Sequence, residues 1–306
     1  MSIRFDDQVA IVTGAGGGLG RTHALALAAR GAKVVVNDLG GDVTGAGGDP
    51  GAAQKVVAEI EAAGGTALAD GADVTKTDQV SAMVEKAMNA WGRVDILVNN
   101  AGVLRDRSFA KMTMDDFAFV LNVHLQGSAN CTSAVWDIMR QQAYGRIVMT
   151  TSSSGLYGNF GQSNYGAAKM GLIGLMNTLV LEGGKYNIRV NALAPVAATR
   201  MTEDLMPQAA LDLVRPEDVS TGLVTLCDRD APNRTILCAG AGGFARTVIQ
   251  ESEGIFLEES ARSPEAVRAA LDTINDMAGA KEYQHGGEQT MKFLTKAAKA
   301  AGVQIS

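Results

Sequence analysis

The chain has 306 residues, of which 46% are hydrophobic and 20% are charged, a composition typical of a folded globular protein rather than a disordered one. The formal net charge of -6 and the lack of a basic run argue against nucleic acid as a partner. No apolar stretch approaches the ~20 residues of a membrane span, and three scattered cysteines without CxxC spacing predict no metal centre.

The first half of the chain alternates short apolar runs with alanine-rich helical stretches. Unbroken apolar runs between helices indicate parallel strands covered on both faces, and therefore a doubly wound α/β fold of the Rossmann type. We expect a single domain at 1–243 with one sheet of about seven strands, followed by a helical extension at 244–306 that packs on the same domain or on a partner subunit. Strands are predicted at 9–13, 33–37, 66–69, 96–99, 146–151, 187–194 and 235–239, and helices at 21–30, 52–63, 80–91, 115–142, 264–277 and 288–301.

A glycine-rich segment, Thr13 to Gly20, follows the first predicted strand and opens the first helix. Its spacing places Gly14, Gly18 and Gly20 in a GxxxGxG pattern. Glycines permit a tight turn and a close approach of the backbone to a pyrophosphate, which then rests on the amides and positive dipole of the helix N-terminus. The segment, which includes Leu19, is therefore predicted to bind a dinucleotide.

Asp38 closes the second predicted strand. A carboxylate at this point accepts hydrogen bonds from the hydroxyls of an adenosine ribose and repels a 2′-phosphate, so the sequence favours NAD over NADP. Arg21, directly after the glycine segment, argues for NADP only weakly, because a first-turn arginine is commonly solvated or ion-paired. The next segment, 40–51, contains six glycines and a proline and is predicted to form a long loop.

Two further segments, 73–74 and 99–102, follow or end the third and fourth predicted strands. Open α/β sheets bind their ligands at the carboxyl ends of the strands, and small residues there leave room for an adenine and a ribose. We therefore expect contacts with the cofactor from Asp73, Val74, Asn100, Ala101 and Gly102.

Tyr165 and Lys169 lie four residues apart in a predicted helix and so share one of its faces. A nearby ammonium group favours the phenolate, so we expect the pKa of Tyr165 to fall from the usual value of about 10. A phenol tuned in this way can take a proton from an alcohol or return it to an alkoxide. Ser152, at the end of the preceding predicted strand, can hold the substrate oxygen.

These motifs, in their order and separation, resemble those of the short-chain dehydrogenase/reductase family across residues 6–243. The resemblance rests on the glycine segment, the motif 99–102, Ser152, Tyr165, Lys169 and Pro195. It implies hydride transfer between the nicotinamide of NAD(P) and a carbonyl or alcohol carbon, with Tyr165 as the acid or base. It also implies that Lys169 holds the nicotinamide ribose and that Ser152 binds the substrate oxygen.

Neighbouring residues offer alternatives for two of these roles. The family's serine lies 13 positions before its tyrosine, which selects Ser152 and leaves Ser154 as the runner-up. Tyr157 is a rival tyrosine, but position 161 is a glycine, so it has no lysine four residues later. We expect Tyr157 to line the pocket instead.

Several loops resemble more narrowly the subfamily formed by the dehydrogenase parts of the peroxisomal multifunctional enzymes. The loops concerned are 37–42, 103–109, 157–162 and 200–202. This resemblance implies oxidation of a (3R)-hydroxyacyl-CoA to a 3-ketoacyl-CoA with NAD. It rests on loops and not on the catalytic residues.

The sequence departs from the family pattern in the long helix. Most members carry an asparagine three residues before a helix glycine, where it holds a water of the proton relay; counted back from Gly127, that position is His124. Asn122 lies two residues earlier, about 200° around the helix, so only one of the two can face the site. The subfamily also carries histidine there, so His124 is either a relay residue or a buried structural histidine.

A second departure is Pro195-Val196, where the family usually has proline and glycine. The resemblance implies that this loop still wraps the nicotinamide, with Thr199 bonding the carboxamide. It also suggests a homodimer or homotetramer formed through the helix 115–142 and the helix that carries Tyr165. The end of the chain is not a Ser-Lys-Leu address, so a stand-alone cytoplasmic enzyme is expected.

Two other functions remain open at this point. One keeps the hydride chemistry but assigns it to a steroid, a terpenoid or another secondary alcohol. The other is a sensor or scaffold that binds NAD without turnover, although such a protein has no need of an acidified phenol.

Overall fold

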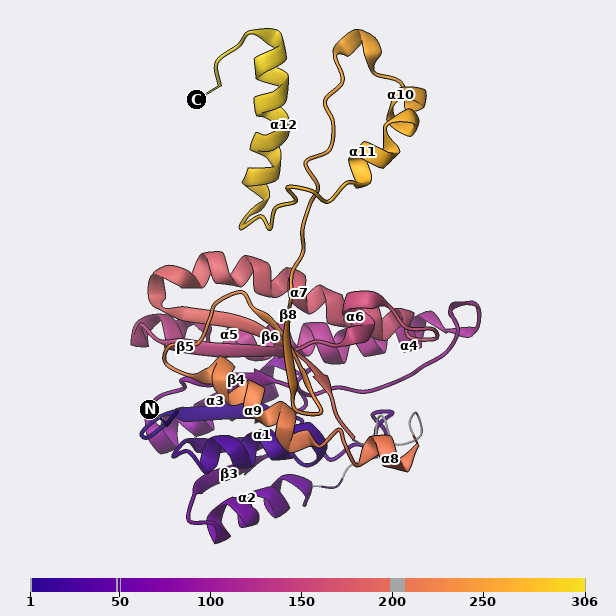
Figure 1. Cartoon of the computed structure of the whole chain (residues 1–306). Coiled ribbons are helices and arrows are strands. Elements are labelled where there is room, and N and C mark those ends of the chain that lie inside the picture. The colour runs from indigo at the N-terminus through magenta and orange to yellow at the C-terminus, as the bar shows by residue number, and fades with distance from the viewer. Residues whose placement is uncertain (1, 48, 50, 199–206, 306) are drawn as a thin grey trace. The chain divides into compact units, whose positions relative to one another are not determined.

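The structure is a computed structural model that describes residues 2–47, 49, 51–198 and 207–305. The chain divides into two compact units, residues 1–246 and 247–306 (Figure 1). Helices and strands alternate along the first unit, as the sequence predicts for a doubly wound α/β fold.

Eight strands form one sheet in the order β3-β2-β1-β4-β5-β6-β7-β8. The pairs from β3 through β7 are parallel. The strand order reverses at β1, which pairs with β2 on one side and with β4 on the other, and such a reversal opens a crevice where α/β sheets bind ligands. The strands are β1 (Val9–Thr13), β2 (Lys33–Asn37), β3 (Thr66–Asp70), β4 (Ile96–Asn99), β5 (Gly145–Thr150), β6 (Ile188–Val196), β7 (Ile236–Gly240) and β8 (Gly243–Thr247).

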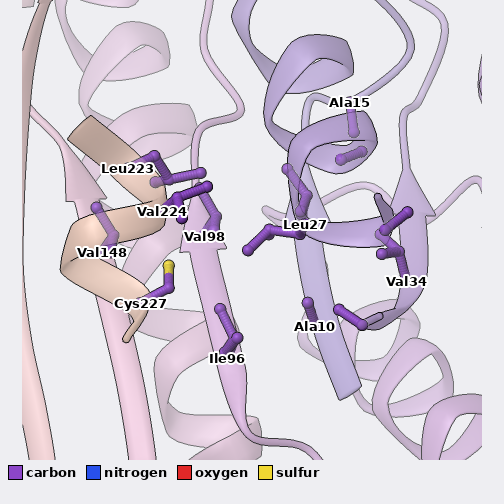
Figure 2. Packing of buried hydrophobic residues seen from close by; sticks show 14 of the residues in the cluster. Ala10, Ala15, Leu27, Val34, Ile96, Val98, Val148, Leu223, Val224 and Cys227 are labelled. Atoms are coloured by element: carbon purple, nitrogen blue, oxygen red, sulfur yellow. The ribbon is translucent and has the colours of Figure 1, made fainter. Parts of the chain in front are cut away.

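Two hydrophobic clusters lie on opposite faces of the sheet. Alternate residues of β1 divide between them: Ala10 and Val12 belong to one cluster, and Val9 and Ile11 belong to the other. Figure 2 shows the first cluster, in which Leu27 and, on the pale orange helix 216–227, Leu223 and Val224 point toward the strands. The first cluster takes residues from α1 (Gly18–Ala28), α2 (Ala52–Ala62) and α9 (Pro216–Cys227), and the second from α3 (Thr77–Trp91), α5 (Gly127–Gln142) and α7 (Ser163–Gly183).

The long helix predicted at 115–142 is interrupted by one π-helical turn. It consists of α4 (Met114–Leu121), a π-helical segment (Asn122–Gln126) and α5. In that segment the backbone N–H of Gly127 donates to the carbonyl of Asn122, five residues earlier. A single π turn inside an α-helix changes which side chains face inward, and such turns are frequent at functional sites.

Strand β8 and helix α9 are among the elements that the sequence does not predict. No strand is predicted beyond residue 244, yet β8 pairs with β7 through a two-residue turn in which Ala241 and Gly242 have φ values of 48° and 74°. Most of β8 is exposed, so it lacks the apolar alternation that marks a strand in the sequence. Helix α9 is also absent from the prediction, although Pro216 at its first position is a common start signal.

The second unit is built mainly from short helices and connecting segments. The single helix predicted at 264–277 is two short helices, and an isolated antiparallel bridge joins Glu251 to Lys281. Lys292 Nζ bonds Glu251 Oε1 at 2.9 Å and so ties the last helix to the start of the unit. The remaining helices of the described residues are α6 (Ser153–Tyr157), α8 (Gln208–Leu211), α10 (Pro264–Ala269), α11 (Leu271–Asn275), α12 (Gly286–Ala301) and the 3-10 turns Phe109–Lys111, Gly184–Tyr186 and Glu259–Ala261.

Two kinds of site are absent from the described ranges. Within them, no helix combines the length and apolar character needed to cross a membrane. Nor do three or more His, Cys, Asp or Glu side chains of these ranges gather where they might share a metal ion.

Candidate active site

A cavity of roughly 300 Å³ opens at the carboxyl ends of the central strands. Most residues that the sequence predicts for the site line it, although they come from seven separate segments of the chain. Thr199 lies outside the described residues, and Val196 is 43% exposed at the end of β6, outside the cavity wall. The predicted residues in the wall are Gly14, Gly18, Leu19, Gly20, Asp38, Asp73, Val74, Asn100, Ala101, Gly102, His124, Tyr165, Lys169 and Pro195.

The glycine turn between β1 and α1 is packed too closely for side chains. Gly14 has a φ of +63°, and a Cβ atom on it would lie 2.7 Å from the Cα of Ala101. A Cβ on Gly20 would lie 2.1 Å from the carbonyl oxygen of Gly14. At Gly17, no side chain caps the first turn of α1. The turn therefore presents backbone N–H groups and the positive helix end to the cavity.

Asn100 holds this turn from the neighbouring strand. Its Nδ2 donates to the carbonyls of Thr13 and Gly14, each at 3.0 Å, and its backbone N–H donates to Thr13 Oγ1 at 3.1 Å. The backbone N–H of Ala101 also donates to Thr13 Oγ1. The side-chain amide of Asn100 thus supports the glycine turn, which the sequence alone does not reveal.

Asp38 lies at the end of β2 with both carboxylate oxygens engaged by backbone N–H groups. Oδ2 accepts from Gly16 and Oδ1 from Gly40, each at 2.7 Å. These bonds fix the carboxylate at the cavity wall, where each oxygen keeps a second lone pair for a ligand hydroxyl. Arg21 forms an ion pair with Glu59, which confirms the ion-paired interpretation of this arginine.

The segment after β3 is fixed in a similar way. Asp73 Oδ1 accepts from the backbone N–H and the hydroxyl of Thr75, at 2.9 and 2.8 Å. The carbonyl of Val74 accepts from Asn130 Nδ2 at 2.9 Å, and a Cβ on Gly127 would lie 2.7 Å from Val74 Cγ2. Asp73 and Val74 are therefore anchored to α5 and to their own turn before any ligand binds.

The long loop after β2 also forms part of the cavity wall, a role that the sequence does not predict. The carbonyl of Val43 accepts from the backbone N–H of Leu104 at 2.8 Å, and the Gly45 backbone packs against the ring of Phe119. Gly41, Val43, Gly45 and Phe119 all line the cavity. Only the tertiary contact between Val43 and Leu104 identifies this role.

Tyr165 and Lys169 line one end of the cavity, and Ser152, which is not among the lining residues, lies beside Tyr165. Lys169 Nζ lies 5.4 Å from the centroid of the Tyr165 ring and donates to the carbonyl of Thr150 at 2.6 Å. The side chains of Ser152 and Tyr165 form a hydrogen bond. Ser152 Oγ also accepts from the backbone N–H of Ser154 at 3.2 Å, because Ser152 is the N-cap of α6.

Burial is the largest influence on the pKa values of Tyr165 and Lys169. It raises the pKa of Tyr165 to about 12, against the opposite effect of the hydrogen bond to Ser152, and it lowers the pKa of Lys169 to about 7. The net shift in the pKa of Tyr165 is thus opposite to the expected fall, because removal of a charge from water outweighs the hydrogen bond to Ser152. Tyr165 keeps part of its surface open to the cavity, so this balance depends on what fills the cavity.

The two alternatives to these residues lie elsewhere. The Oγ of Ser154 donates to Gln162 Oε1 at 2.7 Å rather than to Tyr165. Tyr157 is 71% exposed and is not among the residues that line the cavity. The geometry therefore favours Ser152 over Ser154 as the partner of Tyr165.

His124, and not Asn122, faces the cavity. His124 is 2% exposed, its ring lies edge-on to that of Tyr165 with centroids 5.1 Å apart, and its Nε2 lies 2.8 Å from the Val103 carbonyl oxygen and 3.1 Å from the Val103 nitrogen. Asn122 is exposed. Burial holds the pKa of His124 well below its usual value, so the ring is neutral. Its Nδ1 is buried and has no hydrogen-bond partner in the described structure.

A doubly wound fold with this cavity defines a class of protein. The cavity lies at the reversal of strand order, beside a glycine turn at a helix N-terminus, and Lys169 and Tyr165 line its other end. These features are those of a dinucleotide-dependent oxidoreductase.

The family assignment agrees with this class. Residues 8–210 match the family described as short chain dehydrogenase, and the chain belongs to that family. It is therefore an oxidoreductase that acts on CH–OH groups with a nicotinamide cofactor.

Curated relatives match most of this chain but differ in their own length. The chain is 46% identical over 291 residues to peroxisomal multifunctional enzyme type 2 of Mus musculus, a match that covers 94% of the chain and 39% of the mouse protein. It is 47% identical to peroxisomal multifunctional enzyme A of Dictyostelium discoideum, over 88% of the chain and 60% of that protein. A putative short-chain type dehydrogenase/reductase of Mycobacterium tuberculosis is 47% identical, over 90% of the chain and 96% of the relative.

Solved structures repeat this pattern. Full-length peroxisomal multifunctional enzyme type 2 of Drosophila melanogaster superposes with a TM-score of 0.82 at 38% identity, over 97% of this chain and 50% of the other. A 7 alpha-hydroxysteroid dehydrogenase complexed with NADH and 7-oxo glycochenodeoxycholic acid gives a TM-score of 0.70 at 30% identity, over 78% of this chain and 95% of the other. The chain thus spans about half the length of the multifunctional enzymes and nearly the full length of stand-alone dehydrogenases.

Proposed function

We propose that the protein interconverts a secondary alcohol and a ketone with NAD, and that its substrate pair is a (3R)-hydroxyacyl-CoA and the 3-ketoacyl-CoA. The observation that carries the proposal is the single cavity that holds a glycine turn at one end and Tyr165 with Lys169 at the other. Support for the acyl-CoA comes from the similarity to the multifunctional enzymes, which covers 94% of the chain and so extends into the second unit.

The residues present fit a dinucleotide. The side-chain-free turn at Gly14 and Gly20 lets a pyrophosphate approach the uncapped N-terminus of α1. Asp38, directly after β2, would bind the adenosine ribose. Lys169, in the second turn of α7, would bind the nicotinamide ribose. When bound, NAD supplies the hydride acceptor and a positively charged ring.

Tyr165 exchanges a proton with the substrate oxygen. In alcohol oxidation its phenolate oxygen takes the hydroxyl proton while the carbon gives up its hydride, and in ketone reduction the phenol returns that proton. Ser152, already hydrogen-bonded to Tyr165, holds the same substrate oxygen. Lys169 in its ammonium form stabilises the negative charge of the Tyr165 phenolate, which burial alone disfavours.

We infer that His124 belongs to the proton path. Its unpartnered Nδ1, buried beside Tyr165, is free to bond a water, and the alternative residue Asn122 is exposed. Replacing His124 with leucine is expected to lower kcat by about tenfold or more, whereas His124→Asn keeps a polar group at this position and retains more activity. Steady-state rates of both folded variants test this, and a leucine variant as active as wild type would make His124 a structural residue.

Asp38 is expected to select NAD. Its carboxylate is held at the cavity wall where a ribose would lie, and a charge-assisted bond of this kind contributes about 1.5–3 kcal/mol. The substitution Asp38→Asn keeps the shape and removes the charge, so the ratio of kcat/KM for NAD to that for NADP should fall by about tenfold or more. An unchanged ratio would mean that Asp38 does not read the ribose.

A spectrophotometric screen tests the substrate class. NADH formation is followed with 3-hydroxyacyl-CoA thioesters of several chain lengths, side by side with steroid, terpenoid and simple secondary alcohols. The proposal predicts turnover of the thioesters at the highest kcat/KM. The 30% identity to the 7 alpha-hydroxysteroid dehydrogenase is the observation that favours the second candidate, and faster turnover of a steroid would establish that one instead.

A protein that binds NAD without turnover is the remaining alternative. Such a binder would hold the cofactor tightly and transfer no hydride to any alcohol or ketone of the panel. The side-chain contacts among Ser152, Tyr165 and Lys169 argue against it, because binding alone does not require an acid–base group in the cavity.

We further propose a homodimer or homotetramer formed through α5 and α7. A surface hollow of about 250 Å³ lies on these helices, lined in part by Trp136, Leu175 and Leu179. Apolar hollows of this kind fit a second copy of the same surface. Light scattering coupled to gel filtration measures the mass in solution, and a mass of one chain would contradict the proposal. Packing of the segment 244–306 on its own domain or on a partner stays a prediction.

The cytoplasmic location is likewise a proposal. Several relatives are named as peroxisomal enzymes, while the relative of Mycobacterium tuberculosis that matches nearly end to end is named only as a dehydrogenase/reductase. Fractionation of the native cell, followed by detection of the protein, decides between a cytoplasmic and an organellar location.

A further inference from the structure

The loop after β2 carries a compact turn, residues 41–45, which we call the strap. Asp42 Oδ1 accepts from the backbone N–H and the hydroxyl of Thr44, each at 2.8 Å, and from the backbone N–H of Ala46 at 3.0 Å. The backbone N–H of Asp42 in turn donates to the carbonyl of Ala46 at 2.8 Å. These bonds fix the shape of the turn from within, so the position of the strap depends on what it contacts outside the turn.

The strap is tied to the segment that follows β4. The carbonyl of Val43 accepts from the backbone N–H of Leu104 at 2.8 Å. Arg105 Nε reaches the carbonyl of Thr44 at 3.4 Å. In the sheet, β1 lies between β2 and β4. A connection from the loop after β2 to the segment after β4 therefore spans the end of β1, where the glycine turn begins.

The cavity lies between the strap and the glycine turn. Val43 and Gly45 line it from the strap, and Gly14 and Gly18 line it from the glycine turn. The proposed dinucleotide extends along this cavity from the end of β2 to Lys169. Its pyrophosphate, seated on the glycine turn, would therefore lie beneath the strap.

Arg105 supports the strap from outside the cavity. Its Nη1 forms an ion pair with Asp116 Oδ1 at 2.8 Å, and its guanidinium lies 3.9 Å from the centre of the Phe119 ring. Its carbonyl accepts at 3.0 Å from Nδ2 of Asn164, a residue of α7. Arg105 is not among the residues that line the cavity. It thus joins the strap to α4 and α7 without touching the cofactor site.

The ring of Phe119 transmits this support to the strap. A Cβ atom on Gly45 would lie 2.9 Å from Phe119 Cζ, and the φ of Gly45 is +84°, so glycine permits the close approach. The same ring takes the guanidinium of Arg105, in a contact that favours a cation. Loss of Arg105 therefore removes its bond to the strap and loosens the ring on which the strap rests.

We propose that Arg105 is a positioning residue that latches the strap over the bound cofactor and so limits the rates at which the cofactor enters and leaves. This role rests on the proposed function, because it requires a dinucleotide in the cavity. Arg105 changes how often the strap opens rather than the contacts of the cofactor. Association and dissociation both require opening, so the latch slows both and leaves the affinity nearly unchanged.

The substitution Arg105→Met removes the guanidinium and keeps an unbranched side chain. Loss of a partly buried ion pair and of the ring contact should raise both the association and the dissociation rate constant of NADH by about tenfold. The dissociation constant should change by less than about threefold, because the closed form still predominates. Stopped-flow measurement of NADH fluorescence gives both rate constants without any turnover.

Arg140→Met is the matched control. Arg140 also forms an ion pair, with Asp137 at 2.7 Å, and its guanidinium lies 4.7 Å from the centre of the Tyr186 ring. It belongs to α5 and does not line the cavity, so its loss should leave both NADH rate constants unchanged. A change equal to that of Arg105→Met would overturn the latch.

Hydrogen exchange measures the opening itself. The amide of Leu104, which donates to the strap, should exchange faster in Arg105→Met than in the wild type when no cofactor is added. If Arg105→Met does not fold, Asp116→Asn removes only the charged partner of Arg105. That variant should give a smaller rise in both NADH rate constants and in the exchange rate.

The outcomes separate this proposal from the proposed function. Unchanged NADH rate constants and unchanged Leu104 exchange in the folded variant would overturn the latch, even if the enzyme is active. A weaker affinity with an unchanged association rate constant would also overturn it, because Arg105 would then add affinity without gating. Wild-type protein that binds NADH but turns over no alcohol or ketone would overturn the proposed function alone, since the rate constants still decide the latch. Wild-type protein that binds no NADH would overturn both.

Discussion

Replacing Tyr165 with phenylalanine is expected to lower kcat for both alcohol oxidation and ketone reduction by about two to four powers of ten. The change removes the only atom of this side chain that can exchange a proton and leaves the ring that packs against His124, with centroids 5.1 Å apart. Stopped-flow or steady-state measurement of NADH formation gives the loss directly.

Cofactor binding provides the control for this variant. The Tyr165 hydroxyl bonds Ser152 and not the glycine turn, so the dissociation constant of NAD should change by no more than about threefold. Tyr157→Phe removes the same hydroxyl from the exposed rival tyrosine and should keep nearly full activity. Substantial turnover by Tyr165→Phe, or equal losses in the two variants, would contradict the assignment of the acid–base group.

Replacing Lys169 with methionine is expected to reduce kcat by about two powers of ten or more and to weaken NAD binding. Lys169 is 3% exposed and donates to the carbonyl of Thr150, so its loss leaves a buried acceptor without a partner and removes the cation nearest the phenol. The measurement is kcat, and the Kd of NAD, for the folded variant.

The pH profile gives a further result for this variant. Without the ammonium, the phenolate of Tyr165 loses its stabilising charge, so the midpoint for alcohol oxidation should move to higher pH. Lys185→Met, at an exposed position in the turn after α7, is the control and should leave both rate and midpoint unchanged. Movement of the Lys169→Met midpoint to lower pH would contradict this account.

Local rules account for much of the fold and the site. The glycine turn, Asp38 at the end of β2 and the four-residue spacing of Tyr165 and Lys169 depend on strand and helix geometry within a short stretch of chain, and all of them line one cavity. Strands β1, β2 and β4 coincide with their predicted ranges, because both faces of each are buried and the apolar runs are unbroken.

Other features depend on contacts between distant residues and are not visible in the sequence. The loop at 40–51 joins the cavity wall through Val43 and Leu104, and Asp106 reaches the catalytic helix through Gln162. The choice between Asn122 and His124 depends on a π-helical turn, whose register no helix periodicity predicts. The exposed strand β8 gives no apolar pattern at all.

The expected fall in the pKa of Tyr165 is the sequence-based expectation that differs most from the structure. Spacing alone indicates that Lys169 stands near the phenol, but it contains no measure of burial. Burial raises the pKa of Tyr165 to about 12, so the charges that fill or surround the cavity decide when the phenolate forms. This dependence is the reason why the effect of Lys169 on the pH profile is informative.

The stereochemistry of the substrate tests the central claim most directly. NADH formation is measured with the (3R)- and (3S)-3-hydroxyacyl-CoA of the same chain length, at saturating NAD and with Tyr165→Phe as the blank. NAD bound along this cavity would hold its hydride acceptor at a fixed place relative to Tyr165, so only one hand of the alcohol could present its hydrogen and its hydroxyl to both. The account predicts turnover of the (3R)-thioester alone; turnover of the (3S)-thioester, or of neither, would contradict it.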